Sequence, residues 1–452
     1  MGETTDGIVR IAKGMGFDDV AVDIGTGRNL YLKITNSEID SVVEKLNISC
    51  NIFLTKDKRI LLLSDISDTS RQGIRRIIGS ASKALASVKP KEDYFGLASP
   101  RGGRPKYVYP YDRSIEDCGS AEMADKAIAA VNSALDNGAT SVAGMVVVGS
   151  GSDTVSTSNG FNGTDRGTFA RMSLRVFRGK LSYQNVFASR MLKDVKFDRE
   201  PKEMAEILGS TKKIGKIKDG KYDIVYMQSP GGSLLTNAAS AACMGNAETG
   251  SCFTGKLGKV VAGKDIMLYD DGRIREGIQS SAYDLEGTPS QRTKVVESGI
   301  LRTYLHNHST AEKYNTKSTG NAGLVRPSTR TLVMEHRKTV KDVDKLISSV
   351  DRGILVTNTW YTRFSSYIKG DFSTMPRDLT LYIEKGEPAF AIKQKDIGPI
   401  VGIRISDNLI RMLKNTVLAA RNARQCTSWD VDMDYYFVPS FTVKDVTVTT
   451  VQ

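Results

Sequence analysis

Three stretches in the first half of the chain repeat apolar residues at the spacing of an α-helix. Over residues 8–15, 74–85 and 124–135, apolar side chains recur at i, i+3, i+4 and i+7, which places them on one helical face. Gly138 follows the third stretch, where a left-handed helix end favours glycine. The pattern therefore predicts three amphipathic helices in this half.

Alternation of apolar and polar residues predicts strands between these helices. Residues 51–63 alternate on either side of the turn sequence at 56–58, which is the pattern of a β-hairpin. The short apolar run at 20–24 predicts another strand. Residues 171–176 alternate apolar side chains with Arg and Ser, so we expect a strand with one face in water. The sequence Ser158-Asn-Gly160 ahead of it is typical of a hairpin turn.

The second half is richer in strand and turn patterns than in helices. A Lys- and Gly-rich stretch over 211–221 separates the two halves. We therefore predict an α+β protein with an N-terminal α/β domain at residues 1–210 and a C-terminal strand-rich domain, of mixed or antiparallel sheet, at residues 211–452. In that second domain we expect strands over 222–227, 266–269, 300–306, 331–335, 354–359, 379–384 and 441–450, and helices over 234–244, 343–350 and 408–420.

Composition and charge narrow the class of protein. The 452 residues include 63 Lys or Arg and 51 Asp or Glu, which gives a formal net charge of +12. The cations are spread over short stretches without interleaved aromatic residues, so a nucleic-acid partner is not favoured. No apolar run approaches the roughly 18 residues that a membrane span needs, so we expect no membrane partner.

The cysteines and the N-terminal sequence suggest where the protein works. Cys50, Cys118, Cys243, Cys252 and Cys426 are scattered and form no CxxC pair. An odd number of scattered cysteines is typical of free thiols in a reducing compartment. The N-terminal residues carry acids before the first apolar side chain, unlike a secretory signal. We therefore expect a cytoplasmic protein.

Two glycine-containing motifs could bind phosphate, but each has a simpler explanation. Ser229-Pro-Gly-Gly-Ser233 stands between a predicted strand and a predicted helix, where backbone N–H groups can cradle a phosphate. It lacks the Gly-Lys-Ser/Thr of a P-loop, and Gly25-Thr-Gly27 lacks the third glycine of GxGxxG. We favour a tight strand-to-helix turn for the first motif.

Histidine and carboxylate pairs offer two further candidates for chemistry. His306 and His308 lie at the end of a predicted strand, where alternate side chains share a face and could reach one metal ion. No further ligand follows at a suitable spacing, so two exposed strand histidines are the favoured interpretation. Asp284 and Glu286 could perform acid–base chemistry if buried together, but such pairs are more often solvated turn residues.

Several longer motifs follow one another in a fixed order along most of the chain. Their order and spacing resemble those of the TldD/PmbA (TldE) family of peptidase-related proteins, which are also called modulators of DNA gyrase. The motifs are Asp93-Tyr-Phe-Gly-Leu97, Ser158-Asn-Gly160, Tyr269-Asp-Asp-Gly272, Ser281-Ala-Tyr-Asp-Leu-Glu-Gly-Thr-Pro-Ser-Gln-Arg-Thr293, Val296-Glu-Ser-Gly-Ile-Leu301, Lys317-Ser-Thr-Gly-Asn-Ala-Gly323, Gly370-Asp-Phe-Ser373, Ile383-Glu-Lys-Gly-Glu387 and Val438-Pro-Ser-Phe-Thr-Val443.

The resemblance also assigns the positions of a zinc site. In this family, TldD-type chains carry an HExxxH motif on a helix after a Leu-Leu pair, and a later cysteine. Ser233-Leu-Leu and the downstream Ser251-Cys-Phe segment match the flanks of that motif. The first histidine then falls on Thr236, the glutamate on Asn237 and the second histidine on Ala241, while the cysteine falls on Cys426.

These replacements remove the chemistry of a zinc peptidase. Thr is a poor neutral zinc ligand, Ala has no ligand atom, and the Asn amide cannot take a proton from water. Cys426 alone cannot hold a catalytic zinc ion, which needs about three protein ligands. The chain thus resembles the TldE/PmbA type, which lacks the zinc motif. We expect no metal or cofactor in this chain and zinc in a TldD-type partner.

The resemblance implies a ring-like or clam-like dimer around a cavity that admits unfolded proteins or short peptides. The partner would be a TldD-type subunit in a heterodimer, or a second copy of this chain. Two loop segments supply the candidate residues for lining this cavity, namely Asp284, Glu286, Gly287, Thr288, Ser318, Thr319, Gly320 and Asn321. A role of these residues in forming turns that fix the strand-rich fold explains them equally well.

The leading hypothesis is a non-catalytic subunit of a heterodimeric TldD–TldE metallopeptidase that acts on unfolded proteins or short peptides. Two alternatives stay open. One is a DNA- or gyrase-associated factor, prompted by the +12 charge and the older name of the family. The other is an active metallopeptidase with a non-standard site, for example at His306, His308 and Cys426.

Overall fold

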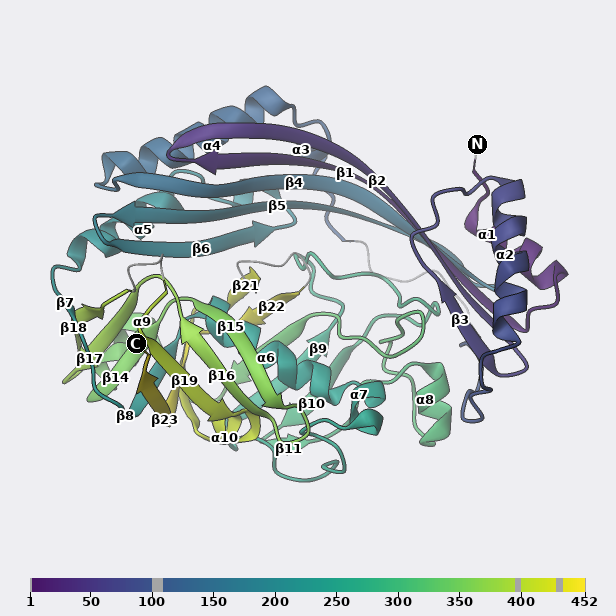
Figure 1. The fold of residues 1–452 in the computed structure, drawn as a ribbon. Helices are drawn as coiled ribbons and strands as arrows, with labels where there is room; N and C mark the ends of the chain where they lie inside the picture. Colours follow the sequence, from purple (N-terminus) through teal and green to yellow (C-terminus); the bar gives the residue numbers. More distant parts are fainter. Residues whose placement is uncertain (1, 100–108, 395–399, 428–433, 452) are drawn as a thin grey trace.

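The structure is a computed structural model that describes residues 2–99, 109–394, 400–427 and 434–451. It combines helices with three sheets, so the predicted α+β class is confirmed. Figure 1 shows a long curved sheet from the first half that arches over the strand-rich second half. The predicted division at residues 210 and 211 stays a prediction.

The arched sheet is antiparallel throughout, in the order β3-β2-β1-β4-β5-β6. The predicted hairpin over 51–63 is confirmed, and Asp57 and Lys58 form its turn with positive φ angles of 49° and 59°. The hairpin turn at Ser158-Asn-Gly160 is also confirmed. The strands are β1 Asp19–Thr35, β2 Glu38–Lys56, β3 Arg59–Leu63, β4 Ser141–Thr157, β5 Asn162–Arg178 and β6 Leu181–Ser189.

The strand expected at 20–24 is far longer than its apolar run. Gly25, Thr26 and Gly27 belong to the interior of β1 and form no loop. A Cβ atom on Gly151 of the neighbouring strand would lie 2.6 Å from the carbonyl oxygen of Thr26, so the two backbones approach closely here. Glycine is needed for this close approach, and it does not break the strand.

Helices cover the two ends of one face of the sheet. At one end, α1 and α2 bury Ile8, Ile74 and Ile78 against β1 and β2. At the other end, α4 and α5 bury Ala127 and Leu208 in a second cluster. The three predicted amphipathic helices are therefore confirmed. The helices are α1 Thr5–Gly14, α2 Arg71–Leu85, α3 Arg113–Glu116, α4 Ser120–Asp136 and α5 Arg199–Ser210, and a short 3₁₀ turn spans Leu192–Asp194.

Two mixed sheets form the second half. One runs β11-β10-β9-β12-β22-β21, and the other runs β15-β16-β19-β23-β8-β14-β17-β18-β7 with β13 and β20 beside it. The first sheet uses β9 Ile266–Asp271, β10 Arg292–Glu297, β11 Ile300–Leu301, β12 Leu332–His336, β21 Arg424–Thr427 and β22 Tyr435–Val438. The second uses β7 Ile214–Gly215, β8 Gly220–Tyr226, β13 Thr339–Val340, β14 Arg352–Val356, β15 Thr359–Ser366, β16 Asp371–Pro376, β17 Thr380–Glu384, β18 Glu387–Ile392, β19 Ile403–Asn408, β20 Thr416–Ala420 and β23 Phe441–Thr450.

Two sequence expectations for this half are wrong. The strand expected over 300–306 ends at Leu301, and the helix expected over 408–420 ends at Lys414. Residues 416–420 instead form β20, because they pair with β13 and β23. The helices of this half are α6 Gln228–Ala242, α7 Met244–Thr249, α8 His308–Lys313, α9 Val343–Ser348 and α10 Leu409–Lys414.

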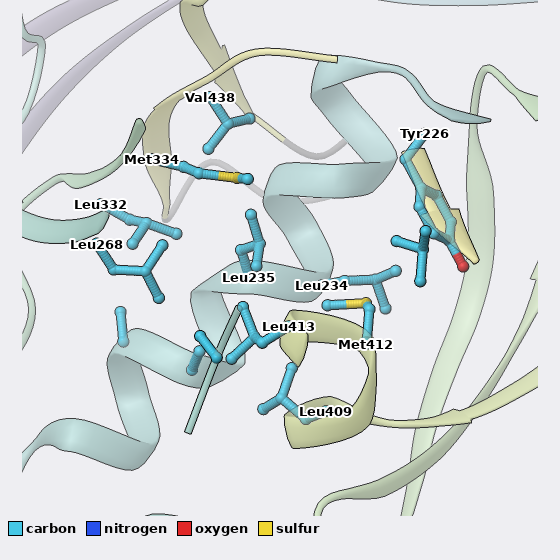
Figure 2. Close-up of a cluster of buried hydrophobic side chains, with 14 of the residues drawn as sticks. Tyr226, Leu234, Leu235, Leu268, Leu332, Met334, Leu409, Met412, Leu413 and Val438 are labelled. Atoms are coloured by element: carbon cyan, nitrogen blue, oxygen red, sulfur yellow. The ribbon is translucent and has the colours of Figure 1, made fainter. Parts of the chain in front are cut away.

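The largest hydrophobic core surrounds α6. Leu234 and Leu235 of this helix are buried between the two sheets and α10. Figure 2 shows their side chains pointing into a cluster that is closed by the labelled residues Tyr226, Leu268, Leu332, Met334, Leu409, Met412, Leu413 and Val438. The helix that carries the zinc-motif positions is therefore a central packing element of this half.

A buried polar network joins the arched sheet to the second half. The Arg175 guanidinium donates to the Asp378 carboxylate, with Nε and Oδ1 2.8 Å apart, and Asp378 is fully buried. Ser182 Oγ and Asn358 Nδ2 donate to the same carboxylate. Since a buried charge needs such partners, this network fixes the arch above the second half. Among the described residues, no helix is long and apolar enough to cross a membrane.

Candidate functional site

The helix α6 begins directly after β8 and contains the glycine-rich motif in its first turns. The helix starts at Gln228, so Gly231 and Gly232 are helical residues and do not form the expected turn. A Cβ atom on Gly232 would lie 2.0 Å from the Tyr436 ring, and one on Gly231 would lie 2.5 Å from the Phe441 ring. The two glycines therefore let aromatic rings pack against the helix backbone, and the motif has a structural role here.

The three positions of the zinc motif lie in the middle and at the end of α6. Thr236 Oγ1 donates to the carbonyl oxygen of Ser233 at 2.9 Å. Asn237 Nδ2 donates to the carbonyl oxygens of Ser233 and Leu234 at 3.1 and 3.3 Å. Ala241 is 8% exposed. Thr236 and Asn237 are thus bonded to their own helix, and none of the three side chains offers a strong metal ligand.

Cys426, the fourth position, lies on β21 and is fully buried. Burial raises the pKa of its thiol, and the neighbouring Arg424 acts in the opposite direction. The strand β21 runs beside the start of α6, where Ser229 Oγ donates to the carbonyl oxygen of Thr427 at 3.1 Å. A neutral buried thiol packs as a small apolar residue, whereas metal binding requires the thiolate.

The interpretation of His306 and His308 as exposed strand residues is wrong. His306 is buried, its Nδ1 lies 3.2 Å from Thr310 Oγ1, and burial lowers the pKa of its imidazole. His308 starts the helix α8 and is half-buried. In the described part of the chain, no three His, Cys, Asp or Glu side chains are grouped so that they could hold a metal ion.

A small pocket lies beside the second half of α6. Its volume is about 280 Å³, and Asn237, Ser240 and Ala241 of α6 face it. The rings of Phe364 and Tyr367 stand 5.0 Å apart in a stacked arrangement, and both line the pocket. No charged side chain is among the lining residues, which also include Asn246, Thr249, Gly250, Ser251, Cys252 and Leu409. Two zinc-motif positions thus border a neutral pocket.

Sequence reasoning did not find the other walls of this pocket. Phe364 of β15, Tyr367 of the turn after it and Leu409 of α10 lie far from α6 in sequence. The available signal was the aromatic run from Trp360 to Tyr367, which ends with a Tyr367 side chain that is 68% exposed. An exposed aromatic side chain of this kind is a common mark of a binding surface.

Asp284 and Glu286 are buried, so their interpretation as solvated turn residues is wrong. Asp284 is 0% exposed and its carboxylate accepts the backbone N–H groups of Glu286, Thr288 and Ala322 at 2.9–3.0 Å. Burial raises the pKa of Asp284, while these three N–H donors favour its charged form. Asp284 therefore ties the 284–288 loop to the 318–323 loop.

Glu286 is 3% exposed and carries the less stable charge of the pair. Its Oε2 accepts the backbone N–H of His308 at 3.0 Å. Burial and the nearby Asp284 charge raise the pKa of Glu286 to about 8. We infer that Asp284 keeps the charge and Glu286 keeps a proton near neutral pH, because Asp284 has more backbone donors.

The remaining candidate residues fix these loops. Asn321 Nδ2 donates to Asp270 Oδ2 at 2.6 Å and to the carbonyl oxygen of Ser328 at 2.9 Å. Thr319 Oγ1 accepts the backbone N–H of His306 at 2.8 Å, and Ser318 Oγ accepts that of Gly320. Gly287 and Gly320 have positive φ angles of 83° and 71°, which glycine adopts without strain.

The structure brings the 284–288 and 318–321 blocks together, and neither block lines the pocket beside α6. Whether they line a cavity in an assembly stays a prediction.

Two parts of the chain match the descriptions of known protein domains. The description "PmbA/TldA metallopeptidase central domain" matches residues 109–211, and "PmbA/TldA metallopeptidase C-terminal domain" matches residues 219–450. An uncharacterized protein of Methanocaldococcus jannaschii is 25% identical over 428 residues, which cover 91% of this chain and 93% of that protein. A metalloprotease TldD homolog of Buchnera aphidicola (subspecies Acyrthosiphon pisum) is 31% identical over 174 residues, which cover 37% of this chain and only 36% of that protein.

A solved structure has the same fold over almost its whole length. TldE from Thermococcus kodakarensis superposes with a TM-score of 0.82 at 18% sequence identity, and the match covers 98% of this chain and 99% of that one. At this level of identity the likeness concerns the fold.

Proposed function

This chain belongs to the PmbA/TldD metallopeptidase family, and we propose that it is a subunit without zinc, which needs a zinc-bearing chain of the same family for cleavage. Its substrates in that assembly are unfolded proteins or short peptides. The zinc ion and the attacking water belong to the partner, and this chain supplies binding surface and stability. The proposal extends to a cytoplasmic heterodimer, with a homodimer of this chain when no partner is present.

The observation that carries the proposal is the chemistry of the three α6 positions. Thr236 and Asn237 donate their hydrogen bonds to backbone carbonyl oxygens of α6 itself, and Ala241 has no polar atom. A zinc peptidase needs two imidazoles to hold the ion and a carboxylate to take a proton from the attacking water. None of these groups is present on α6.

The pocket beside α6 supports a role in holding peptide. The strand β15 ends the larger sheet, so its outer edge has no partner strand among the described residues. Phe364 of this strand and the exposed Tyr367 that follows it line the neutral pocket. An extended peptide could add to this edge through backbone hydrogen bonds and place one uncharged side chain in the pocket. Such binding depends little on sequence, which suits unfolded substrates.

A reconstitution assay tests the proposal. Fluorescein-labelled casein serves as an unfolded substrate for this chain, for a zinc-bearing relative with HExxxH, and for their mixture. We expect no cleavage by this chain and faster cleavage by the mixture than by the relative alone. Cleavage by this chain alone, abolished by chelation of metal, would contradict the proposal.

A second arm of the assay tests the pocket. Ser240→Trp fills the pocket from the exposed side of α6, and Ser80→Trp places the same side chain on the exposed face of α2 as a control. We expect Ser240→Trp to slow the mixture by about fivefold or more and Ser80→Trp to leave it unchanged. Equal rates for both variants would show that the pocket does not bind substrate, but would not contradict the proposal that this chain needs a zinc-bearing partner.

The alternative of an active site at His306, His308 and Cys426 has little support in the geometry. His306 and Cys426 are both buried, and burial disfavours the charged thiolate that would bind a metal. A DNA- or gyrase-associated role rests on the net charge and on the older family name, and it stays an alternative.

A further inference from the structure

A hollow between α1 and α2 is larger than the pocket beside α6, and the proposed function does not use it. It has a volume of about 570 Å³. The two helices stand at one end of the arched sheet, at the right of Figure 1. Gly7 and Gly14 face it from α1, and a Cβ atom on Gly14 would have no neighbour within 4 Å. A volume of this size suits a small-molecule ligand.

The charge of this hollow is strongly positive for its size. Arg10 of α1 and Arg71 and Arg75 of α2 line it, against a single acid, Glu3. The pair between Arg71 Nε and Glu3 Oε1 is loose at 3.8 Å. Arg10 Nε donates only to a backbone carbonyl oxygen, at 3.3 Å. Arg75 forms no hydrogen bond or ion pair within the described part of the chain.

The neighbouring Arg76 differs from Arg75, because it does not line the hollow and has a carboxylate partner. Its guanidinium is 3.1 Å from the Asp68 carboxylate. The helix α2 also has no acidic residue in its first turn, where Arg71 is the first residue. Positive side chains at the positive end of a helix repel one another and the helix dipole. An anion in the hollow would relieve that repulsion.

The remaining lining decides the kind of anion. Ile11 and Met15 give the hollow an apolar side, and no aromatic ring lines it. Arginine forks bind phosphate through paired hydrogen bonds, whereas an apolar wall favours contact with the organic part of a ligand. We propose that the hollow between α1 and α2 binds a phosphate-bearing small molecule. This site is independent of the proposed peptidase function, because it lies on other elements.

Isothermal titration of the full chain with pyrophosphate, with ADP and with adenosine tests the proposal. We expect pyrophosphate and ADP to bind with sub-millimolar affinity and adenosine to show no binding, because the arginines recognise the phosphate. Arg75→Ala should weaken ADP binding by about fivefold or more, and Arg76→Ala, the adjacent arginine with its own carboxylate partner, should change it less than about twofold. Gly14→Phe, whose Cβ atom has no neighbour within 4 Å, should occupy the hollow and abolish binding while all three arginines remain.

Each other result overturns the proposal. Absence of binding by both pyrophosphate and ADP does so directly. Equal losses for Arg75→Ala and Arg76→Ala would show general attraction by surface charge. Undiminished binding by Gly14→Phe would place the ligand elsewhere. If duplex DNA bound more tightly than ADP and Arg75→Ala weakened that binding, the arginines would be a contact surface for nucleic acid.

Discussion

At the residue scale, the geometry of α6 gives a second reason, beside the chemistry of the replaced motif, to expect no zinc ion on this helix. Thr236 and Ala241 are five residues apart, and each residue turns an α-helix by about 100°, so the two positions point about 140° apart. Asn237 and Ala241 face the pocket, and Thr236 is not among its lining residues. Two imidazoles at 236 and 241 could therefore meet one ion only if a bulge widened the helix.

This geometry predicts that restoring the motif does not restore the metal. The triple variant Thr236→His/Asn237→Glu/Ala241→His should contain less than about 0.2 zinc ion per chain after dialysis against zinc, because its two imidazoles diverge. Metal content is measured by plasma mass spectrometry, and circular dichroism checks that the variant is folded. One zinc ion per folded chain would show that the helix adapts to the metal.

The buried Glu286 makes stability depend on pH. Its pKa is about 8 in the folded chain against an ordinary value of 4.5, so the folded state binds the proton more strongly than the unfolded state. Stability from this group is therefore lost as the pH rises from 4.5 through 8, because the charged form is buried beside Asp284.

Glu286→Gln should remove this part of the pH dependence. The amide resembles the protonated carboxyl and can still accept the N–H of His308. We expect the melting temperatures of wild type and variant to be similar near pH 4.5, and the variant to melt progressively higher as the pH rises, by several degrees near pH 9. Glu38→Gln changes an exposed residue and serves as the control. A wild type that stays level with Glu286→Gln at both pH values would refute the assignment of the proton to Glu286.

At the scale of elements, α6 depends on close contact with two strands. Tyr436 of β22 packs on Gly232, and the Tyr436 hydroxyl donates to the carbonyl oxygen of Ser229 at 2.8 Å. The contact leaves no space for a methyl group, because a Cβ atom at 232 would lie 2.0 Å from the ring. The helix and the smaller sheet are therefore held in one relative position.

Gly232→Ala should destabilise the chain although alanine favours helices. The overpacked contact with Tyr436 should cost about 1–3 kcal/mol. Gly14→Ala in α1 is the control, since its Cβ atom meets open space and the change should stabilise the chain by about 0.5–1 kcal/mol. Chemical denaturation of both variants measures the difference. If Gly232→Ala proved as stable as Gly14→Ala, the tight contact would be disproved.

The elements that the sequence predicted are those whose signal is local. The period of 3.6 residues located α1, α2 and α4, because each helix buries a single stripe of its own. The full length of β1 was missed because Gly25 and Gly27 are typical of turns, whereas here they allow the close approach of β4. β20 was assigned to a helix because its strand pairing depends on distant partners.

The same distinction holds for the candidate site. The replaced positions on α6 were found through a motif of neighbouring residues. The pocket next to them was not found, because Phe364 and Leu409 come together with α6 only in three dimensions. The burial of Asp284 and Glu286 was also missed, since it depends on loops from separate parts of the chain.

At the scale of the whole molecule, the +12 charge is spread over both halves. We therefore expect labelled duplex DNA to bind weakly near 50 mM salt and to be released near 200 mM salt, in roughly the range where phosphate contacts lose most of their strength. Fluorescence anisotropy measures this binding. Sub-micromolar affinity at the higher salt concentration would favour the DNA-associated alternative.

We propose that this molecule keeps the fold of a peptidase family without binding the metal of the reaction. The most direct test is the zinc content of the purified full chain, measured by plasma mass spectrometry after expression with added zinc and after co-expression with an HExxxH relative. We expect less than about 0.1 zinc ion per copy of this chain alone, and about one ion per pair in the complex. One tightly bound ion in the isolated chain, together with cleavage of unfolded casein, would contradict this expectation.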